Sequence, residues 1–126
     1  MINFITIMSE RNQHTSIIIV AGEVSGDIHG AGLITALKKL DPSLDIQGIG
    51  GDLMIKEGLK PLFHIKQMAF LGLWEVLKHL PFIKEVFGDM IRLVKSIRPK
   101  AVILIDYPGS NLRFAKKIYK MGIPVI

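Results

Sequence analysis

The sequence predicts an α/β fold in which a Rossmann-like parallel sheet carries helices on both faces. Three observations support this class. An apolar, β-branched run over 16–21 leads directly into a glycine-containing loop and a helical pattern. A second such run over 101–105 is followed by a turn and another helical pattern. Continuous apolar runs are typical of strands buried on both faces of a parallel sheet. The 126 residues suffice for about one domain.

The first half of the chain alternates strand and helix patterns. Pro42 ends the first helix, because proline disfavours helical backbone at the preceding residue. Gly50 and Gly51 end the second strand, and Asp52 is expected to cap a short helix. The expected elements are a strand over 16–21, a helix over 28–40, a strand over 45–50, a short helix over 52–57 and a weaker strand over 59–64.

The second half repeats this order. Residues 72–80 are expected to form a short apolar helix or turn, and Pro81 opens a longer helix that ends before Pro99. A strand over 101–105, a helix over 111–121 capped by Gly122, and the start of another strand over 124–126 complete the pattern. The residues of the longer helix that recur at helical spacing and should face the core are Ile83, Val86, Phe87, Met90, Val94 and Ile97.

Composition and charge exclude several classes of protein. Cysteine is absent, which excludes a disulfide framework and a thiolate metal site. The four histidines lack metal-ligand spacing, so we expect no metal site. Residues 1–55 carry three basic and six acidic side chains, whereas residues 56–126 carry thirteen basic and five acidic ones. The basic part fits either a polyanionic partner or an ordinary lysine-rich surface. We interpret residues 1–15 as a loose leader and 16–126 as the domain.

The loop after the first strand is the first candidate site. Gly26 lets a ligand or a neighbouring loop approach the backbone, and Glu23, Ser25 and Asp27 place polar groups at the carboxyl end of a buried strand. Ligands bind at this position in open α/β sheets. Either Ser25 or Asp27 is expected to cap the following helix, whose first amides could hold a phosphate. A purely structural, helix-capping role for this loop is the alternative.

Two further segments carry candidate functional residues. Asp106 directly follows the second buried strand. It could act as a general base beside the first loop if the two strands are neighbours, or simply form a turn before Pro108. The segment 68–87 mixes large apolar residues with lysines, which fits either an anionic membrane surface or buried core. The segment has more large apolar residues than one helix face can bury, so some of them would form an exposed apolar patch. These residues are Phe70, Leu73, Trp74, Leu77 and Phe82.

Four motifs together resemble the lipid-A-disaccharide synthase family, a bacterial family of glycosyltransferases. They are AGEVSGDIHGAGL over 21–33, GIGGDLM over 48–54, LGLWEVL over 71–77 and IDYPGSN over 105–111, and they follow the family's order and spacing. The similarity covers residues 16–126. It implies the N-terminal half of a two-domain GT-B glycosyltransferase, truncated before the C-terminal nucleotide-sugar domain.

The resemblance also implies a reaction and its residues. A diacylglucosaminyl group would pass from UDP-2,3-diacylglucosamine to the 6-hydroxyl of 2,3-diacylglucosamine 1-phosphate, with inversion, release of UDP, and no metal or other cofactor. Asp106 matches the family's catalytic aspartate, and Asn111 closes the same motif. The residues that match the family's first loop, beside the acceptor cleft, are Glu23, Ser25, Gly26 and Asp27.

Location and partners are implied in the same way. The family works as a peripheral protein on the cytoplasmic face of the inner membrane, and the segment 70–84 corresponds to its membrane- and acyl-contacting region. Expected partners are therefore the two lipid-linked sugars, the anionic membrane surface and the missing C-terminal half. An exposed sheet edge would favour pairing with a partner or a second copy of the chain.

This chain departs from the family in its second loop, where Tyr107, Pro108, Gly109 and Ser110 leave no second carboxylate to assist Asp106. Without a nucleotide-sugar domain we expect the chain alone to be inactive. A free-standing α/β module that binds a phosphorylated ligand or an anionic lipid is the alternative. Nucleic-acid binding rests on charge alone, because no recognisable module for it is present, and we expect no nucleic-acid partner.

Overall fold

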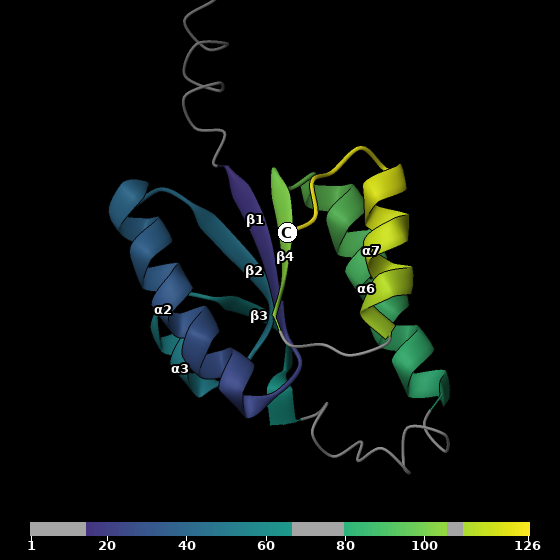
Figure 1. Cartoon of the computed structure of the whole chain (residues 1–126), viewed down its shortest axis with the longest axis horizontal. Helices are drawn as coiled ribbons and strands as arrows, with labels where there is room; N and C mark the ends of the chain where they lie inside the picture. Colours follow the sequence, from purple (N-terminus) through teal and green to yellow (C-terminus); the bar gives the residue numbers. More distant parts are fainter. Residues whose placement is uncertain (1–14, 67–79, 106–109) are drawn as a thin grey trace, which may run out of the picture.

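A parallel β-sheet forms the middle layer of the fold, between two pairs of helices (Figure 1). The computed structural model describes residues 15–66, 80–105 and 110–126, and within them four strands lie in the order β3-β2-β1-β4. The strands are β1 (Ser16–Ala21), β2 (Asp45–Gly50), β3 (Lys60–His64) and β4 (Ala101–Ile105). Helices α2 (Val24–Leu40) and α3 (Asp52–Lys56) cover one face, and α6 (Leu80–Ile97) and α7 (Ser110–Lys120) cover the other. The predicted α/β class, with helices on both faces, is confirmed.

Strand β1 is the centre of the core because its alternate side chains point to opposite faces of the sheet. Ile18 and Val20 join the apolar cluster beneath α6 and α7, whereas Ile19 and Ala21 join the cluster beneath α2 and α3. All four residues are buried. The continuous apolar run therefore reflects a strand covered on both faces, as predicted.

Each helix contributes an apolar stripe to one of these two clusters. Val86, Met90 and Val94 of α6 recur at helical spacing and are buried, as the sequence predicts. On the opposite face, Ile34 of α2 and Met54 of α3 are fully buried. The two helical layers are thus fixed to the sheet by separate apolar clusters.

The order in which strands are added to the sheet reverses between β1 and β4, although the described strands all run parallel. From β1 the chain passes to β2 and then to β3, and it returns through α6 to place β4 on the other side of β1. The chain extends the sheet again near its C-terminus, where Val125 forms a parallel bridge with Val102. In open α/β sheets, ligands bind outside the carboxyl ends of the strands at such a reversal.

Gly48 shows why the sheet needs glycine in β2. Its φ is +144°, and a Cβ at this position would lie 2.0 Å from the carbonyl oxygen of Ile19. The pairing of β2 with β3 shifts register between Gly48 and Ile49. Glycine therefore permits both the backbone conformation and the close approach of β1.

The start of α2 and the capping residue of α3 differ from the sequence prediction. Helix α2 begins at Val24 rather than near Ile28, so the glycine-containing segment forms its first turn. Gly26 is tolerated there because its backbone packs against Ala21 and Ile105. Helix α3 begins at Asp52, but its N-cap residue is Gly51. The prediction that Asp52 caps α3 is therefore wrong.

Other predictions fall outside the described residues: the leader over 1–14, most of the helix or turn over 72–80, and the loop over 107–109. Among the helices that the structure describes, none is both long and apolar enough to cross a membrane.

Candidate functional site

The candidate site lies where β1 and β4 end side by side. Ala21 pairs with Ile105 in the sheet, and the amide of Gly22 donates a hydrogen bond to the carbonyl oxygen of Ile105 at an N···O distance of 3.4 Å. The first loop and Asp106 can form one site only if these two strands are neighbours. The pairing of β1 with β4 confirms that condition.

Glu23 and Ser25 are exposed at this edge of the sheet. Glu23 is the N-cap residue of α2 and makes no side-chain capping hydrogen bond. The prediction that Ser25 or Asp27 caps α2 is therefore wrong, because the helix begins before both of them. The exposed polar groups of Glu23 and Ser25 can instead face a ligand.

Gly26 holds the first turn of α2 close to both strands. A Cβ at this position would lie 3.1 Å from the Cβ of Ala21 and 3.4 Å from the Cγ2 of Ile105. Gly26 is buried. It therefore contributes to the site by allowing α2 to start directly over the ends of β1 and β4.

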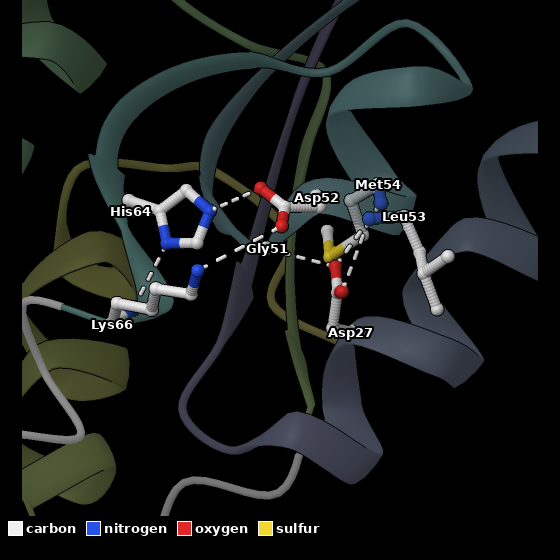
Figure 2. A network of polar contacts seen from close by, with 7 residues as sticks. All are labelled: Asp27, Gly51, Asp52, Leu53, Met54, His64 and Lys66. Atoms are coloured by element: carbon white, nitrogen blue, oxygen red, sulfur yellow. Dashed lines mark hydrogen bonds and ion pairs between the residues drawn. The ribbon is translucent and has the colours of Figure 1, made fainter.

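Asp27 uses its carboxylate to bind the start of another helix (Figure 2). Its Oδ1 accepts hydrogen bonds from the amides of Gly51 at 2.8 Å and Met54 at 3.0 Å, and its Oδ2 accepts one from Leu53 at 3.2 Å. The Asp27 residue is only 6% exposed. Three amides at the start of α3 thus receive their acceptor from α2, since Gly51 has no side chain to offer.

Asp52 begins α3 and points to the end of β3, where it meets His64 and Lys66 (Figure 2). The Nδ1 of His64 accepts a hydrogen bond from the amide of Lys66 at 3.0 Å, so the ring proton lies on Nε2. That Nε2 donates to Oδ1 of Asp52 at 2.8 Å, and the Lys66 ammonium lies 4.0 Å from Oδ2. The hydrogen bond from His64, followed by the charge of Lys66, lowers the pKa of Asp52.

The first loop is flanked by a neighbouring segment on each side. β1 pairs with β4 on one side and with β2 on the other. The loop at Gly22 therefore lies between the end of β4, at Ile105, and the turn at Gly51 and Asp52 that follows β2. On the side of β2 and β3, the side chains of Asp27, Asp52 and His64 place polar groups at the carboxyl edge of the sheet.

Several predicted site residues lie outside the described part of the structure. Asp106 is one of them, although the preceding residue, Ile105, is described. Asn111 belongs to α7, but its side chain is outside the description. The predicted membrane-contact residues outside it are Phe70, Leu73, Trp74 and Leu77, together with the side chain of Phe82 in α6.

Two features of the site were not predicted from the sequence: the contact of Asp27 with α3, and the cluster of Asp52, His64 and Lys66. Asp27 and Gly51 are 24 positions apart, and no local pattern joins them. One signal was available: a helix that begins after two glycines lacks its own side-chain cap and needs an acceptor from elsewhere.

Comparisons with known proteins identify relatives over most of the chain. Residues 17–126 match the family model described as Lipid-A-disaccharide synthetase. A lipid-A-disaccharide synthase of Trichlorobacter lovleyi is 44% identical over 110 residues, which cover 87% of this chain and 29% of that protein. One from Geobacter sulfurreducens is 41% identical, with coverage of 94% and 31%. One from Coxiella burnetii is 39% identical, with coverage of 88% and 30%. The chain thus spans less than a third of the length of each of these relatives.

Proposed function

The chain belongs to the lipid-A-disaccharide synthetase family, and from this premise we propose that it forms the acceptor side of a glycosyltransferase of lipid A biosynthesis. The enzyme transfers the diacylglucosaminyl group of UDP-2,3-diacylglucosamine to 2,3-diacylglucosamine 1-phosphate. The products are the lipid A disaccharide 1-phosphate and UDP. The match over residues 17–126 is the observation that carries this proposal.

The position of the site supports the proposal. The first loop and the end of β4 meet at the reversal of strand order, through the pairing of Ala21 with Ile105 and the hydrogen bond from Gly22. A doubly wound sheet binds its ligands there. The exposed Glu23 and Ser25 are available to bind the hydroxyl groups of the acceptor sugar.

Asp106 acts as the general base in this proposal. Its carboxylate takes the proton of the acceptor 6-hydroxyl while that oxygen attacks the anomeric carbon of the donor. The bond from the anomeric carbon to the phosphate oxygen breaks, and UDP leaves with the electron pair, so the configuration inverts. Asn111, at the start of α7, helps to bind the acceptor. The reaction needs no metal or other cofactor.

Asp27 and Gly26 act on the substrate site in a different way from Glu23 and Ser25. The Asp27 carboxylate is buried, and both of its oxygens accept hydrogen bonds from backbone amides. Asp27 therefore contributes to substrate binding by holding the adjoining turn in its shape. Gly26 contributes the close packing of α2 against the sheet.

The acyl chains of both substrates place the enzyme at a membrane. We propose that it works as a peripheral protein on the cytoplasmic face of the bacterial inner membrane. Acyl chains and anionic lipid contact the apolar residues of the segment 70–84, with its lysines beside them. The residues proposed for this contact are Phe70, Leu73, Trp74, Leu77 and Phe82.

A chimaeric enzyme tests the proposed function. Residues 17–126 replace the matching segment of the Trichlorobacter lovleyi relative, which is 44% identical over 110 residues. Formation of the disaccharide 1-phosphate and release of UDP are measured with both lipid substrates, with each alone, and with the parent enzyme as control. We expect product only when both substrates are present. A chimaera that unfolds cooperatively but makes no disaccharide, beside an active parent, would contradict the proposal.

A further inference from the structure

The carboxylate of Asp27 joins the first turn of α2 to the start of α3, two segments that lie far apart in the sequence. It accepts hydrogen bonds from the amides of Gly51, Leu53 and Met54 (Figure 2). The residue is 6% exposed, and all three distances lie between 2.8 and 3.2 Å. A negative charge at the start of a helix also interacts favourably with the helix dipole. The turn at Gly51 and Asp52 is thereby fixed relative to the first loop.

The packing around this contact leaves little freedom for the turn. A Cβ on Gly51 would lie 2.5 Å from Oδ2 of Asp27, so any larger residue there would displace the carboxylate. A Cβ on Gly30, further along α2, would lie 2.6 Å from the Sδ of Met54. Glycine at both positions brings α2 and α3 close enough for the Asp27 carboxylate to reach the amides.

Asp52 is the side chain whose position depends on this turn. It directly follows Gly51, is 77% exposed at its side chain, and forms the hydrogen bond with His64. Because β2 neighbours β1, Asp52 flanks the first loop on the side away from β4. A shift of the turn would therefore move one side of the acceptor site without reaching the general base.

We propose that Asp27 is a positioning residue for acceptor binding: it holds the Gly51–Asp52 turn in place and so fixes the wall of the acceptor site opposite β4. The proposal rests on the proposed function. It assigns Asp27 no contact with substrate. Displacement of the turn is expected to weaken acceptor binding while leaving donor binding and the chemical step largely intact.

A second polar contact between α2 and α3 supplies a matched control. The Oγ1 of Thr35 donates a hydrogen bond to Oε2 of Glu57 at 3.0 Å. Glu57 is the C-cap residue of α3, so this contact lies at the opposite end of that helix from Gly51. Thr35→Val removes a connection between the same two helices without touching the turn.

The kinetic test uses the chimaeric enzyme with Asp27→Asn, Gly51→Ala or Thr35→Val. Asp27→Asn removes the charge and one acceptor, and Gly51→Ala displaces the carboxylate without changing any charge. We expect each of these two variants to raise the KM for the acceptor by about tenfold, since small misplacements at a binding site weaken productive binding. The KM for the donor and kcat should change little. Thr35→Val should lower the melting temperature but leave both KM values unchanged.

Amide hydrogen exchange supplies a readout that does not depend on activity. In the 126-residue chain, an asparagine at position 27 can still accept from Gly51 and Met54 through one oxygen, but its amino group cannot accept from Leu53. Asp27→Asn should therefore speed exchange at the Leu53 amide more than at Gly51 and Met54. Thr35→Val should leave this pattern unchanged.

The outcomes separate the two proposals. An active chimaera in which Asp27→Asn and Gly51→Ala leave the acceptor KM unchanged, as Thr35→Val should, or raise the donor KM as much as the acceptor KM, overturns the positioning role alone. Unchanged exchange at Leu53 in Asp27→Asn also overturns it. A folded, unsubstituted chimaera without activity overturns the proposed function, and the positioning role with it.

Discussion

The amide of Gly22 donates a hydrogen bond to the carbonyl oxygen of Ile105, with 3.4 Å between the two atoms. This contact joins the residue after β1 to the last residue of β4, and Asp106 follows Ile105 directly in the sequence. The two segments are more than 80 positions apart and meet only because β4 pairs with β1. The reversal of strand order thus assembles the candidate site from distant parts of the chain.

Two glycines of α2 should respond in opposite ways to alanine. Gly30→Ala places a Cβ 2.6 Å from the Sδ of the fully buried Met54, so overpacking should lower the free energy of unfolding by about 1–3 kcal/mol. A Cβ at Gly32 would have no described atom within 4 Å, so Gly32→Ala should raise the free energy of unfolding by about 0.5–1 kcal/mol. Urea denaturation of both variants provides the comparison. Equal changes in the free energy of unfolding for the two variants would contradict the close packing of α2 on α3.

Alanine substitutions of Ile34 and Ile28 in α2 should change the free energy of unfolding by different amounts, because Ile34 is buried and Ile28 is exposed. Ile34 is 0% exposed in the cluster beneath α2, so Ile34→Ala should lower the free energy of unfolding by about 2–5 kcal/mol. Ile28 is 57% exposed, and Ile28→Ala should stay within about 0.5 kcal/mol of the unsubstituted chain. Denaturant unfolding of both variants measures these two changes: a shifted midpoint with an unchanged m-value reports a change in the free energy of unfolding. A similar loss of stability in the two variants would mean that α2 turns a different face to the sheet.

The carboxyl group of Asp52 should titrate below its ordinary pKa of 3.8, because His64 donates a hydrogen bond to it and the charge of Lys66 lies nearby. Its pKa is lower in the folded state than in the unfolded state. Its stabilising effect is therefore complete above pH 3.8 and is lost as the pH falls through the lowered pKa.

Carbon-detected NMR titration of the Asp52 side chain measures this pKa directly. His64→Phe should raise it towards the ordinary value, and Lys66→Gln should raise it less, because the hydrogen bond from His64 is the larger cause. The prediction fails if the pKa of Asp52 is the same in the unsubstituted chain, in His64→Phe and in Lys66→Gln.

Membrane binding should depend on the apolar segment. Replacing Phe70, Trp74 and Leu77 together by serine should abolish co-sedimentation with vesicles of anionic phospholipid, since these side chains are proposed to enter the interface. Tyr119→Ser is the control, because Tyr119 is a large apolar side chain that is 73% exposed on α7. Binding that persists in the triple variant would favour the alternative of an anion-binding module that acts through the first loop and the basic half.

The sequence predicted the strands better than the helix starts. The bounds of β1, β2 and β4 agree with the prediction because each is a short run closed by glycine, proline or an acidic residue. The start of α2 was misplaced by four residues. Glycine and serine disfavour helix in isolation, but here the close packing of Gly26 on Ala21 and Ile105 outweighs that preference.

The candidate site was predicted in part. The residue before Asp106 lies beside the first loop because β1 and β4 are neighbours, which the sequence prediction had set as a condition. The pattern of alternating strands and helices implied a parallel sheet but not the order of its strands. The role of Asp27 could not be found in the same way. Its three hydrogen bonds reach 24 to 27 positions along the chain, so the local capping rule assigned it to the wrong helix.

The most direct test of the proposed site is the turnover of the chimaeric enzyme with Asp106→Ala, measured as release of UDP at saturating concentrations of both lipid substrates. Loss of the general base should lower kcat by about 10²–10⁴-fold, while the melting temperature and the secondary structure stay unchanged. Near-normal turnover in this folded variant would contradict the assignment of Asp106, and with it the proposed acceptor site between the first loop and β4.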